Sequence, residues 1–349
     1  MVRRGSAVRV RYSASLFTRQ IPLQMTRHLL PWVGLLAFTA LLSIPAAMTA
    51  TAPPADDAPT VLHTAPVGTP LSAPGRGNLY MCRLKVLLGH APPPVSQVDV
   101  PWRDGNLLSV AGMEQVAVPG AVPVKHRFKV TTTRTTRTFM GNGMPPWPIG
   151  IFPIPPDSAA YSYYSPLPAL PPYPSAAAIP VKPYHLHVTV PRQPKVNRKP
   201  TCIDSFSTGV SLDGVTWHAE LAGVNPTTFV DPNAALPTDN CFGHPWNTQY
   251  HIHGYSWKCM TRQGRPGEAS PLLGYAWDGF GVYGPRGPGG KWITNAQLDE
   301  CHGMTSTVMW EGKMRRMYHY VLNNEFPYSI GCFRGTPAKL PMNLRHKMS

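Results

Sequence analysis

Charged side chains are scarce in this chain: Asp, Glu, Lys and Arg make up 14% of its 349 residues, and only 17 residues are acidic. Ordinary globular domains carry about 25% charged residues. Proline, by contrast, is abundant at 42 residues. Because proline interrupts helices and cannot donate within a strand ladder, the composition disfavours a helical enzyme. It predicts a mostly β fold with long Pro-rich loops and short helices, in a chain long enough to bury a real core.

Sequence signatures of catalysis are also missing. The chain has no Gly-x-Ser-x-Gly elbow, no His-Glu-x-x-His pair and no phosphate-binding loop. The sequence therefore identifies no reaction and leaves open whether the protein is an enzyme. N-glycosylation is not expected either, because the Asn-x-Thr pattern at Asn225 contains the blocking Pro226.

The net charge of +15 does not predict nucleic-acid binding. Residues 1–50 contain no acidic residue and supply six of these charges as Arg. The other basic residues are dispersed and form no motif that reads bases. A nucleic-acid partner is therefore not expected, and weak attraction to acidic glycans or surfaces is the simpler interpretation.

A single long apolar run covers residues 29–44. It follows Arg27 and His28 and leads into small residues at positions 46–52, an arrangement typical of a secretory signal peptide. The run is short for a membrane span, which requires about 20 apolar residues. We expect residues 1–50 to be a signal peptide and the protein to be secreted. A retained signal anchor, which would add a membrane partner, is the alternative.

Two later segments share one pattern, which predicts an internal duplication. Residues 238–259 contain Asp239, a Cys, a Gly and then Tyr250-His251-Ile252-His253, followed by a second Cys. Residues 298–332 contain Asp299, a Cys, a Gly and then Tyr318-His319-Tyr320, again followed by a Cys. The spacers between these shared residues differ in length.

The six cysteines all lie after the signal segment and predict three disulfides in an exported protein. A cysteine zinc site is disfavoured because no Cys-x-x-Cys pair occurs. Six cysteines allow 15 pairings. The duplication favours three of these pairs: Cys241 with Cys259, Cys301 with Cys332, and the remaining Cys82 with Cys202.

The chain divides by composition into four parts. Residues 51–77 are rich in Ala, Pro and Thr and predict a disordered linker, with order beginning near Asn78. Residues 78–336 predict a single large disulfide-stapled domain that contains the duplication, and residues 337–349 form a basic tail. Within the domain we expect strands at 126–131 and 184–190, hairpins at 209–217 and 272–283, a proline-rich wrap at 144–183, and a short helix at 295–301.

Several ordered blocks resemble the YHYH-domain family of secreted proteins. They are Pro200-Thr-Cys-Ile, Gly209-Val-Ser-Leu-Asp-Gly-Val, Gly243-His-Pro with Tyr250-His-Ile-His, Leu273-Gly-Tyr-Ala-Trp-Asp-Gly-Phe-Gly-Val-Tyr-Gly-Pro, Leu298-Asp-Glu-Cys-His-Gly, and Tyr318-His-Tyr with Gly331-Cys-Phe-Arg-Gly. The resemblance covers residues 100–336 and implies a secreted, disulfide-bonded domain without a settled biochemical activity. Ile252 stands where the family motif has Tyr, and Val321 stands where it often has His.

The first Tyr-His copy predicts a transition-metal site. In an extended strand, His251 and His253 project from the same face about 6.6 Å apart, so two imidazoles can share one ion. A third ligand is expected from His244, or from His319 if the two copies pack about a pseudo-twofold axis. Imidazole ligands suit Zn or Cu. Three carboxylates are candidates to orient the imidazoles from behind: Asp239, Asp299 and Asp278.

Two alternatives compete with this hypothesis. His185 and His187 mimic the motif, but alternation places them on the outer face of an amphipathic strand. The Tyr-His units can also be core strands whose His residues are hydrogen-bonded and hold no metal. The protein would then be an extracellular structural module, or one that binds carbohydrate or another unidentified extracellular ligand, and the surplus of Trp and Tyr favours the binding role.

Overall fold

A computed structural model of the chain describes residues 58–82, 94–167, 172–225 and 228–345. The expected signal peptide, residues 1–50, lies outside these residues. The described residues belong to one unit, residues 50–349, that is β-rich and contains few, short helices. The fold class predicted from composition is therefore confirmed. No helix in the described part of the chain combines the length and the apolar character that crossing a membrane requires.

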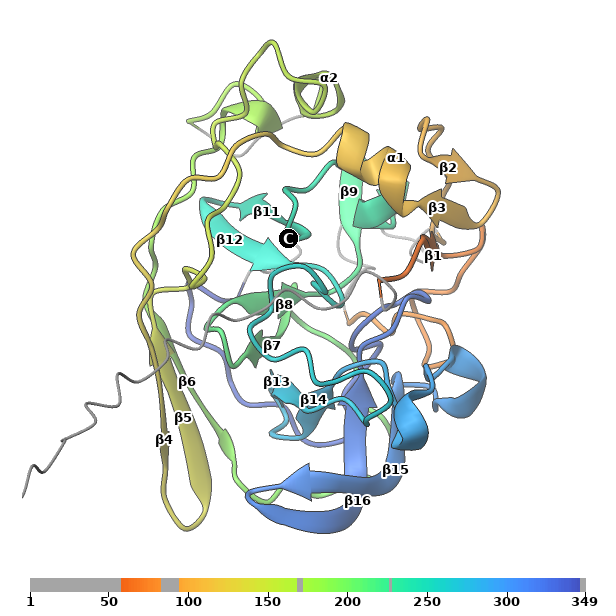
Figure 1. Ribbon diagram of the computed structural model, residues 1–349, viewed down its shortest axis with the longest axis vertical. Helices are drawn as coiled ribbons and strands as arrows, with labels where there is room; N and C mark the ends of the chain where they lie inside the picture. Colours follow the sequence, from red (N-terminus) through yellow and green to blue (C-terminus); the bar gives the residue numbers. More distant parts are fainter. Residues whose placement is uncertain (1–57, 83–93, 168–171, 226–227, 346–349) are drawn as a thin grey trace, which may run out of the picture. The chain divides into compact units, whose positions relative to one another are not determined.

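The main sheet has eight strands in the order β11–β12–β8–β7–β13–β14–β16–β15. In Figure 1, β11 and β12 lie near the top and the β15–β16 hairpin at the bottom. Their bounds are β7 Ser207–Ser211, β8 Thr216–His218, β11 Gly243–Trp246, β12 Gln249–Ile252, β13 Leu272–Ala276, β14 Gly281–Tyr283, β15 Gly303–Trp310 and β16 Lys313–Val321. The two hairpins expected from Asp-Gly turns are β7–β8 and β13–β14. The inner strands β7, β8 and β12 are buried at every residue.

This strand order is the same when read outward from either side of the central β7–β13 pair. From the centre, the first half runs β7, β8, β12, β11, and the second runs β13, β14, β16, β15. In both halves the second and third strands pair in parallel, whereas the remaining neighbours, including β7 and β13, are antiparallel. The sheet is thus two copies of one four-stranded unit related by a pseudo-twofold axis, which confirms the predicted duplication.

The loop before each Tyr-His strand is built in the same way in both copies. Asp239 Oδ1 accepts hydrogen bonds from the backbone N–H groups of Cys241 and Gly243, at 2.9 and 3.1 Å. Asp299 Oδ1 accepts the corresponding bonds at 3.0 and 3.1 Å. A Cβ on either loop glycine would overlap the hydroxyl of the Tyr that also binds the Asp. Only Gly at this position lets the Tyr hydroxyl approach the carboxylate.

A second sheet of three strands packs on the first. It comprises β4 Phe128–Thr132, β5 Thr136–Gly141 and β6 Leu186–Pro191, in the order β4–β5–β6. Phe139 of β5 lies 5.4 Å from Tyr275 of the main sheet between ring centroids, so the two sheets share one core. His185 and His187 lie on the exposed face, as expected for an ordinary amphipathic strand.

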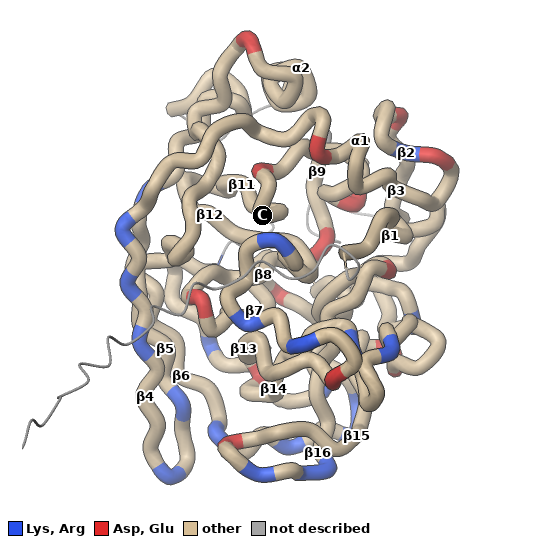
Figure 2. The backbone as a smooth tube through the Cα atoms, viewed as in Figure 1, with Lys and Arg blue, Asp and Glu red and all other residues tan. Residues whose placement is uncertain are grey.

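Arg137 of β5 fixes the end of the β15–β16 hairpin to the second sheet. The side chain of Arg137 is buried, its guanidinium lies 4.0 Å from the Tyr275 ring centroid, and it forms an ion pair of 2.7 Å with Glu311. Figure 2 shows cations along β4 and around this hairpin, separated by few acidic residues.

The remaining elements are short. They are β1 Val61–His63, β2 Arg103–Asp104, β3 Leu107–Ser109, α1 Val110–Gln115, α2 Tyr161–Tyr164, β9 Ala222–Asn225, β10 Thr228–Val230, and the 3-10 turns Ala176–Ala178, Pro232–Ala234, Pro288–Gly290 and Asn295–Gln297. In its described residues, 144–167 and 172–183, the Pro-rich segment contains α2 and one 3-10 turn, and it buries Trp147, Ile149 and Tyr164. It is therefore packed on the domain.

Three expectations about boundaries need correction. Residues 58–77 are not a disordered linker, because β1 pairs with β3 and both Leu62 and Leu71 are buried. Residues 337–345 are part of the domain, since Leu344 is buried and its carbonyl accepts a hydrogen bond from Ser205. The helix expected at 295–301 is a single 3-10 turn, although its capping residues Thr294 and Gln297 interact as predicted.

The three cysteine pairs inferred from the duplication are those found: Cys82–Cys202, Cys241–Cys259 and Cys301–Cys332. The bonds at Cys241 and Cys301 each anchor one copy of the loop that we call the Asp-Cys-Gly loop, residues 239–243 in the first half and 299–303 in the second. The chain has no free cysteine. Such a disulfide set is typical of an extracellular or otherwise oxidising environment.

Candidate metal centre

Three imidazoles of the first half converge on one point. His244 lies on β11, directly opposite His251 of β12, and His253 follows β12 immediately. His253 Nε2 lies 3.0 Å from His244 Nε2 and 3.2 Å from His251 Nε2. Within the described residues, these three side chains form a group whose possible ligand atoms all lie within 4.8 Å of one another.

The other ring nitrogen of each imidazole points away from this centre and has a partner of its own. His253 Nδ1 lies 2.8 Å from Glu220 Oε2, and His251 Nδ1 lies 3.3 Å from the carbonyl of Gln249. His244 Nδ1 lies 2.5 Å from the hydroxyl of Tyr164, which itself donates to the carbonyl of Pro237. Each partner can accept a hydrogen bond, so the contacts assign the N–H to Nδ1 in all three rings.

This assignment leaves three Nε2 lone pairs facing one another. Two nitrogens bound to one Zn²⁺ at about 2.0 to 2.1 Å are separated by roughly 3.3 Å in a tetrahedral arrangement, and by about 2.9 Å at a right angle. The separations of 3.0 and 3.2 Å fall within this interval. The ring positions therefore match those of ligands around a single ion.

Burial disfavours the charged forms of His244 and His251. His244, His251 and His253 are 5%, 3% and 4% exposed. Removal from water lowers the pKa of His244 and of His251 well below the usual value, and neighbouring imidazoles lower both further. A neutral imidazole keeps the lone pair that a metal ion requires.

Two residues that contribute to this centre were not predicted from the sequence. Glu220 is fully buried, and burial raises its pKa to about 7 even though His253 lies beside it. His218 of β8 stacks on His251 with ring centroids 3.7 Å apart. Both follow the Asp213-Gly214 hairpin, far from the Tyr-His motif in sequence, and only the pairing of β8 with β12 brings them together.

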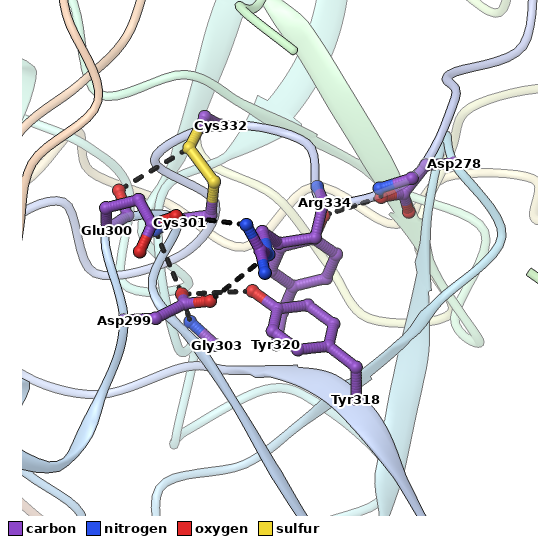
Figure 3. Close-up of polar contacts among 10 residues, drawn as sticks. Asp278, Asp299, Glu300, Cys301, Gly303, Tyr318, Tyr320, Cys332 and Arg334 are labelled. Carbon is purple, nitrogen blue, oxygen red and sulfur yellow. Dashed lines mark hydrogen bonds and ion pairs between the residues drawn. A yellow bond between two sulfur atoms is a disulfide. The ribbon is translucent and has the colours of Figure 1, made fainter. Parts of the chain in front are cut away.

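The three predicted carboxylates do not contact the imidazoles. Asp239 and Asp299 bind their own loops and the hydroxyls of Tyr250 and Tyr318, whereas Asp278 accepts from Tyr320 at 2.6 Å. Figure 3 shows the second-half contacts around Asp278 and Asp299. The prediction that they orient ligands was wrong: a carboxylate that satisfies a turn is turned toward its own backbone. Among the carboxylates, Glu220 contacts an imidazole of the group, His253, at 2.8 Å.

His319 does not join the cluster. The pseudo-twofold axis passes between β7 and β13, so four strands separate β12 from β16. Five spacings of about 4.8 Å therefore place the two Tyr-His strands roughly 24 Å apart. At the positions equivalent to His218, His244 and His253, the second half has Tyr283, Met304 and Val321. It therefore retains one imidazole and lacks the cluster.

The fold and the site define a disulfide-bonded β domain with a buried three-histidine centre. A family model described as "YHYH protein" matches residues 187–290, which include β7–β14 and all three converging histidines. Over these residues the chain is similar to the YHYH family, in agreement with the resemblance seen in the sequence. Strands β15 and β16 lie outside the matched residues. No curated protein and no solved structure matches the chain.

Proposed function

We propose that the protein binds one transition-metal ion, Zn or Cu, through the Nε2 atoms of His244, His251 and His253. The observation that carries this proposal is that the two nitrogens of each ring face different kinds of partner. Every Nδ1 meets an acceptor, while every Nε2 is directed at the common centre. Three lone pairs that converge in a buried site, with His253 Nε2 at 3.0 and 3.2 Å from the other two, repel one another, and a cation at the centre removes that repulsion.

A metal-free arrangement competes with this proposal. A second proton on His253 would let its Nε2 donate to the other two imidazoles, with the Glu220 carboxylate balancing the charge. This arrangement buries an ion pair, whose desolvation cost is high unless its hydrogen bonds are good. Binding of a divalent ion uses the same carboxylate as the acceptor of the ligand N–H, an arrangement common behind metal-bound histidines.

The donor set narrows the choice of ion. Three imidazole nitrogens without sulfur or oxygen ligands suit Zn and Cu better than Mg or Ca, which prefer oxygen. The proposed setting is extracellular, with residues 1–50 removed as a signal peptide. The three disulfides support an oxidising compartment.

Elemental analysis of the purified protein tests the proposal. The protein is loaded with Zn²⁺ or Cu²⁺, passed over a desalting column and analysed for retained metal; one ion per chain is expected. The variant His251→Ala/His253→Ala is expected to retain none.

The matched control is His185→Ala/His187→Ala, which removes the same sequence motif from the exposed face of β6. This control is expected to retain one ion per chain. Equal metal retention by the two double variants would contradict the proposal, as would a wild-type protein that retains no metal ion.

A further inference from the structure

The two halves differ in what covers the Asp-Cys-Gly loop. In the first half the chain itself covers it: Val118 N–H donates to the carbonyl of Thr238 at 2.9 Å, and Gly150 N–H donates to Asp239 Oδ2 at 3.0 Å. These donors come from two neighbouring extended segments joined by the bridge between Val122 and Ile149. Asp239, which accepts one of these hydrogen bonds, is buried.

In the second half, two arginines contact the equivalent acceptors. Arg76 Nε donates to the carbonyl of Leu298 at 2.9 Å, and Arg334 Nε lies 3.5 Å from Asp299 Oδ2. Figure 3 shows Arg334 above the Tyr318 ring, between the loop and the disulfide. Two guanidinium groups thus stand where the first half has two backbone N–H groups.

An open pocket of about 410 Å³ lies over this loop. That volume falls within the usual range of small-ligand sites, about 300 to 1,000 Å³, and is far larger than a single inorganic anion needs. Besides Arg76 and Arg334, its lining includes Gln297, Thr305, Val196 and Met304.

The charges of the lining are unevenly compensated. Arg334 is paired with Asp299 and with Glu300, whose Oε1 lies 3.0 Å from Arg334 Nη1. The side chain of Arg76 makes no ion pair within the described part of the chain, and its hydrogen bond uses Nε alone. Its two terminal nitrogens are therefore available as a fork for a planar or tetrahedral anion.

The remaining lining suits hydroxyl groups and a ring face. Gln297 Oε1 already accepts the N–H of Thr294, so its amide nitrogen is left to donate. Thr305 is exposed and adds a hydroxyl, while Val196 is 49% exposed and adds apolar surface. The pocket thus offers one unpaired guanidinium, hydrogen-bonding side chains and an apolar wall.

We propose that this pocket binds an acidic saccharide, a sugar ring that carries a carboxylate or a sulfate. The anionic group lies against Arg76, the ring hydroxyls meet Gln297 and Thr305, and the ring face lies on Val196 and Met304. The site is separate from the histidine centre, and binding there does not depend on a metal.

Ligand-observed NMR or calorimetry on the full chain tests this proposal with three probes: glucuronate, glucose and inorganic sulfate. Glucuronate is expected to bind, glucose to bind at least about tenfold more weakly, and sulfate to compete with glucuronate. The variant Arg76→Gln is expected to weaken glucuronate binding about 10- to 100-fold, the range for loss of a charge-assisted hydrogen bond. Gln297→Ala is expected to weaken glucuronate but not sulfate.

The matched control is Arg265→Gln, which removes one exposed positive charge outside the pocket. It is expected to bind glucuronate like the wild type, and so is His251→Ala/His253→Ala, which separates this site from the metal proposal. Three results would overturn the inference: no binding of glucuronate, equal losses in the Arg76 and Arg265 variants, or sulfate binding as tight as glucuronate with no effect of Gln297→Ala.

Discussion

The Tyr250 hydroxyl donates a hydrogen bond of 2.8 Å to Asp239 Oδ2, beneath the loop that presents His244. Tyr318 makes the corresponding bond to Asp299 at 3.0 Å in the second half. In each copy, a buried phenol and a carboxylate, buried in Asp239 and partly exposed in Asp299, fix the turn between the first Cys and the Gly. Because the two pairs differ mainly in exposure, they allow one interaction to be compared in two environments.

Tyr250→Phe is expected to lower the free energy of unfolding by about 1 to 3 kcal/mol, since it removes a donor from a carboxylate that is only 4% exposed. Tyr318→Phe is expected to cost less, because the Asp299 side chain is 25% exposed and water can replace the lost donor. Urea unfolding of the metal-free protein measures both. A larger cost at Tyr318 would contradict this account of the loop.

Removing the outer partners of the imidazoles is expected to weaken metal binding without abolishing it. Glu220→Gln and Tyr164→Phe each leave the three Nε2 atoms in place but change the acceptor of a ligand N–H. Losses of about 10- to 100-fold in metal affinity are typical for such partners. Competition with a chromophoric chelator measures the affinity. Ser329→Ala, which removes the other contact of Glu220, is the control and should bind metal normally.

The two equivalent disulfides are expected to differ in their effect on the metal. Cys241–Cys259 holds the loop that leads into His244, whereas Cys301–Cys332 holds the loop of the half without the cluster. Replacing the first pair with Ala should weaken metal affinity, because the loop loses its anchor. Replacing the second pair should lower stability by a few kcal/mol, with metal affinity unchanged. Chelator competition and urea unfolding on both variants separate the two effects, and equal affinity losses would refute the expectation.

Acid should destabilise the protein through histidines of the second half. Burial lowers the pKa of His302 to about 4 and that of His319 to about 4, from an ordinary value of 6.5. Above pH 6.5 both histidines are neutral in the folded and in the unfolded chain, so the protein has the full stability that their burial allows. As the pH falls from 6.5 to 4, only the unfolded chain gains the protons, so stability falls by up to about 3 kcal/mol per buried histidine.

His302→Phe tests this pH dependence, because Phe242 occupies the equivalent position in the first half. The variant should lose the part of the decrease that His302 contributes, while His319, His244 and His251, whose pKa values burial also lowers, keep contributing theirs. Urea unfolding at several pH values in the presence of a chelator isolates the effect from the metal site. An unchanged slope would show that His302 is not protonated differently in the two states.

Local patterns predicted much of this structure. The strands at residues 126–131 and 184–190 alternate in sequence and in burial, and both Asp-Gly dipeptides turn hairpins. The duplication even determined the disulfide pairing, since each copy contains its own short-range bond. The buried residues around Leu62 were missed, because three residues of strand in a Pro- and Ala-rich stretch carry no periodic signal.

The site was predicted in part, for a physical reason. His251 lies on β12, His253 directly follows it and His244 lies on the other strand of the same hairpin, so local geometry brings the three together. Glu220 and His218 reach the site through a parallel pairing of distant strands, which spacing cannot reveal. His319 was a candidate third ligand because the sequence does not show where the axis that relates the two copies lies. The axis passes between β7 and β13, which keeps the two Tyr-His motifs apart.

The symmetric strand order has one more consequence. An isologous dimer of identical four-stranded subunits would have to place the same side chains at both equivalent positions. When both units belong to one polypeptide that restriction is absent, so equivalent positions can carry different side chains in the two units. The expected stoichiometry is accordingly a single ion per polypeptide, held by the first unit. The loop of the second unit can carry arginines where backbone N–H groups cover the equivalent loop of the first.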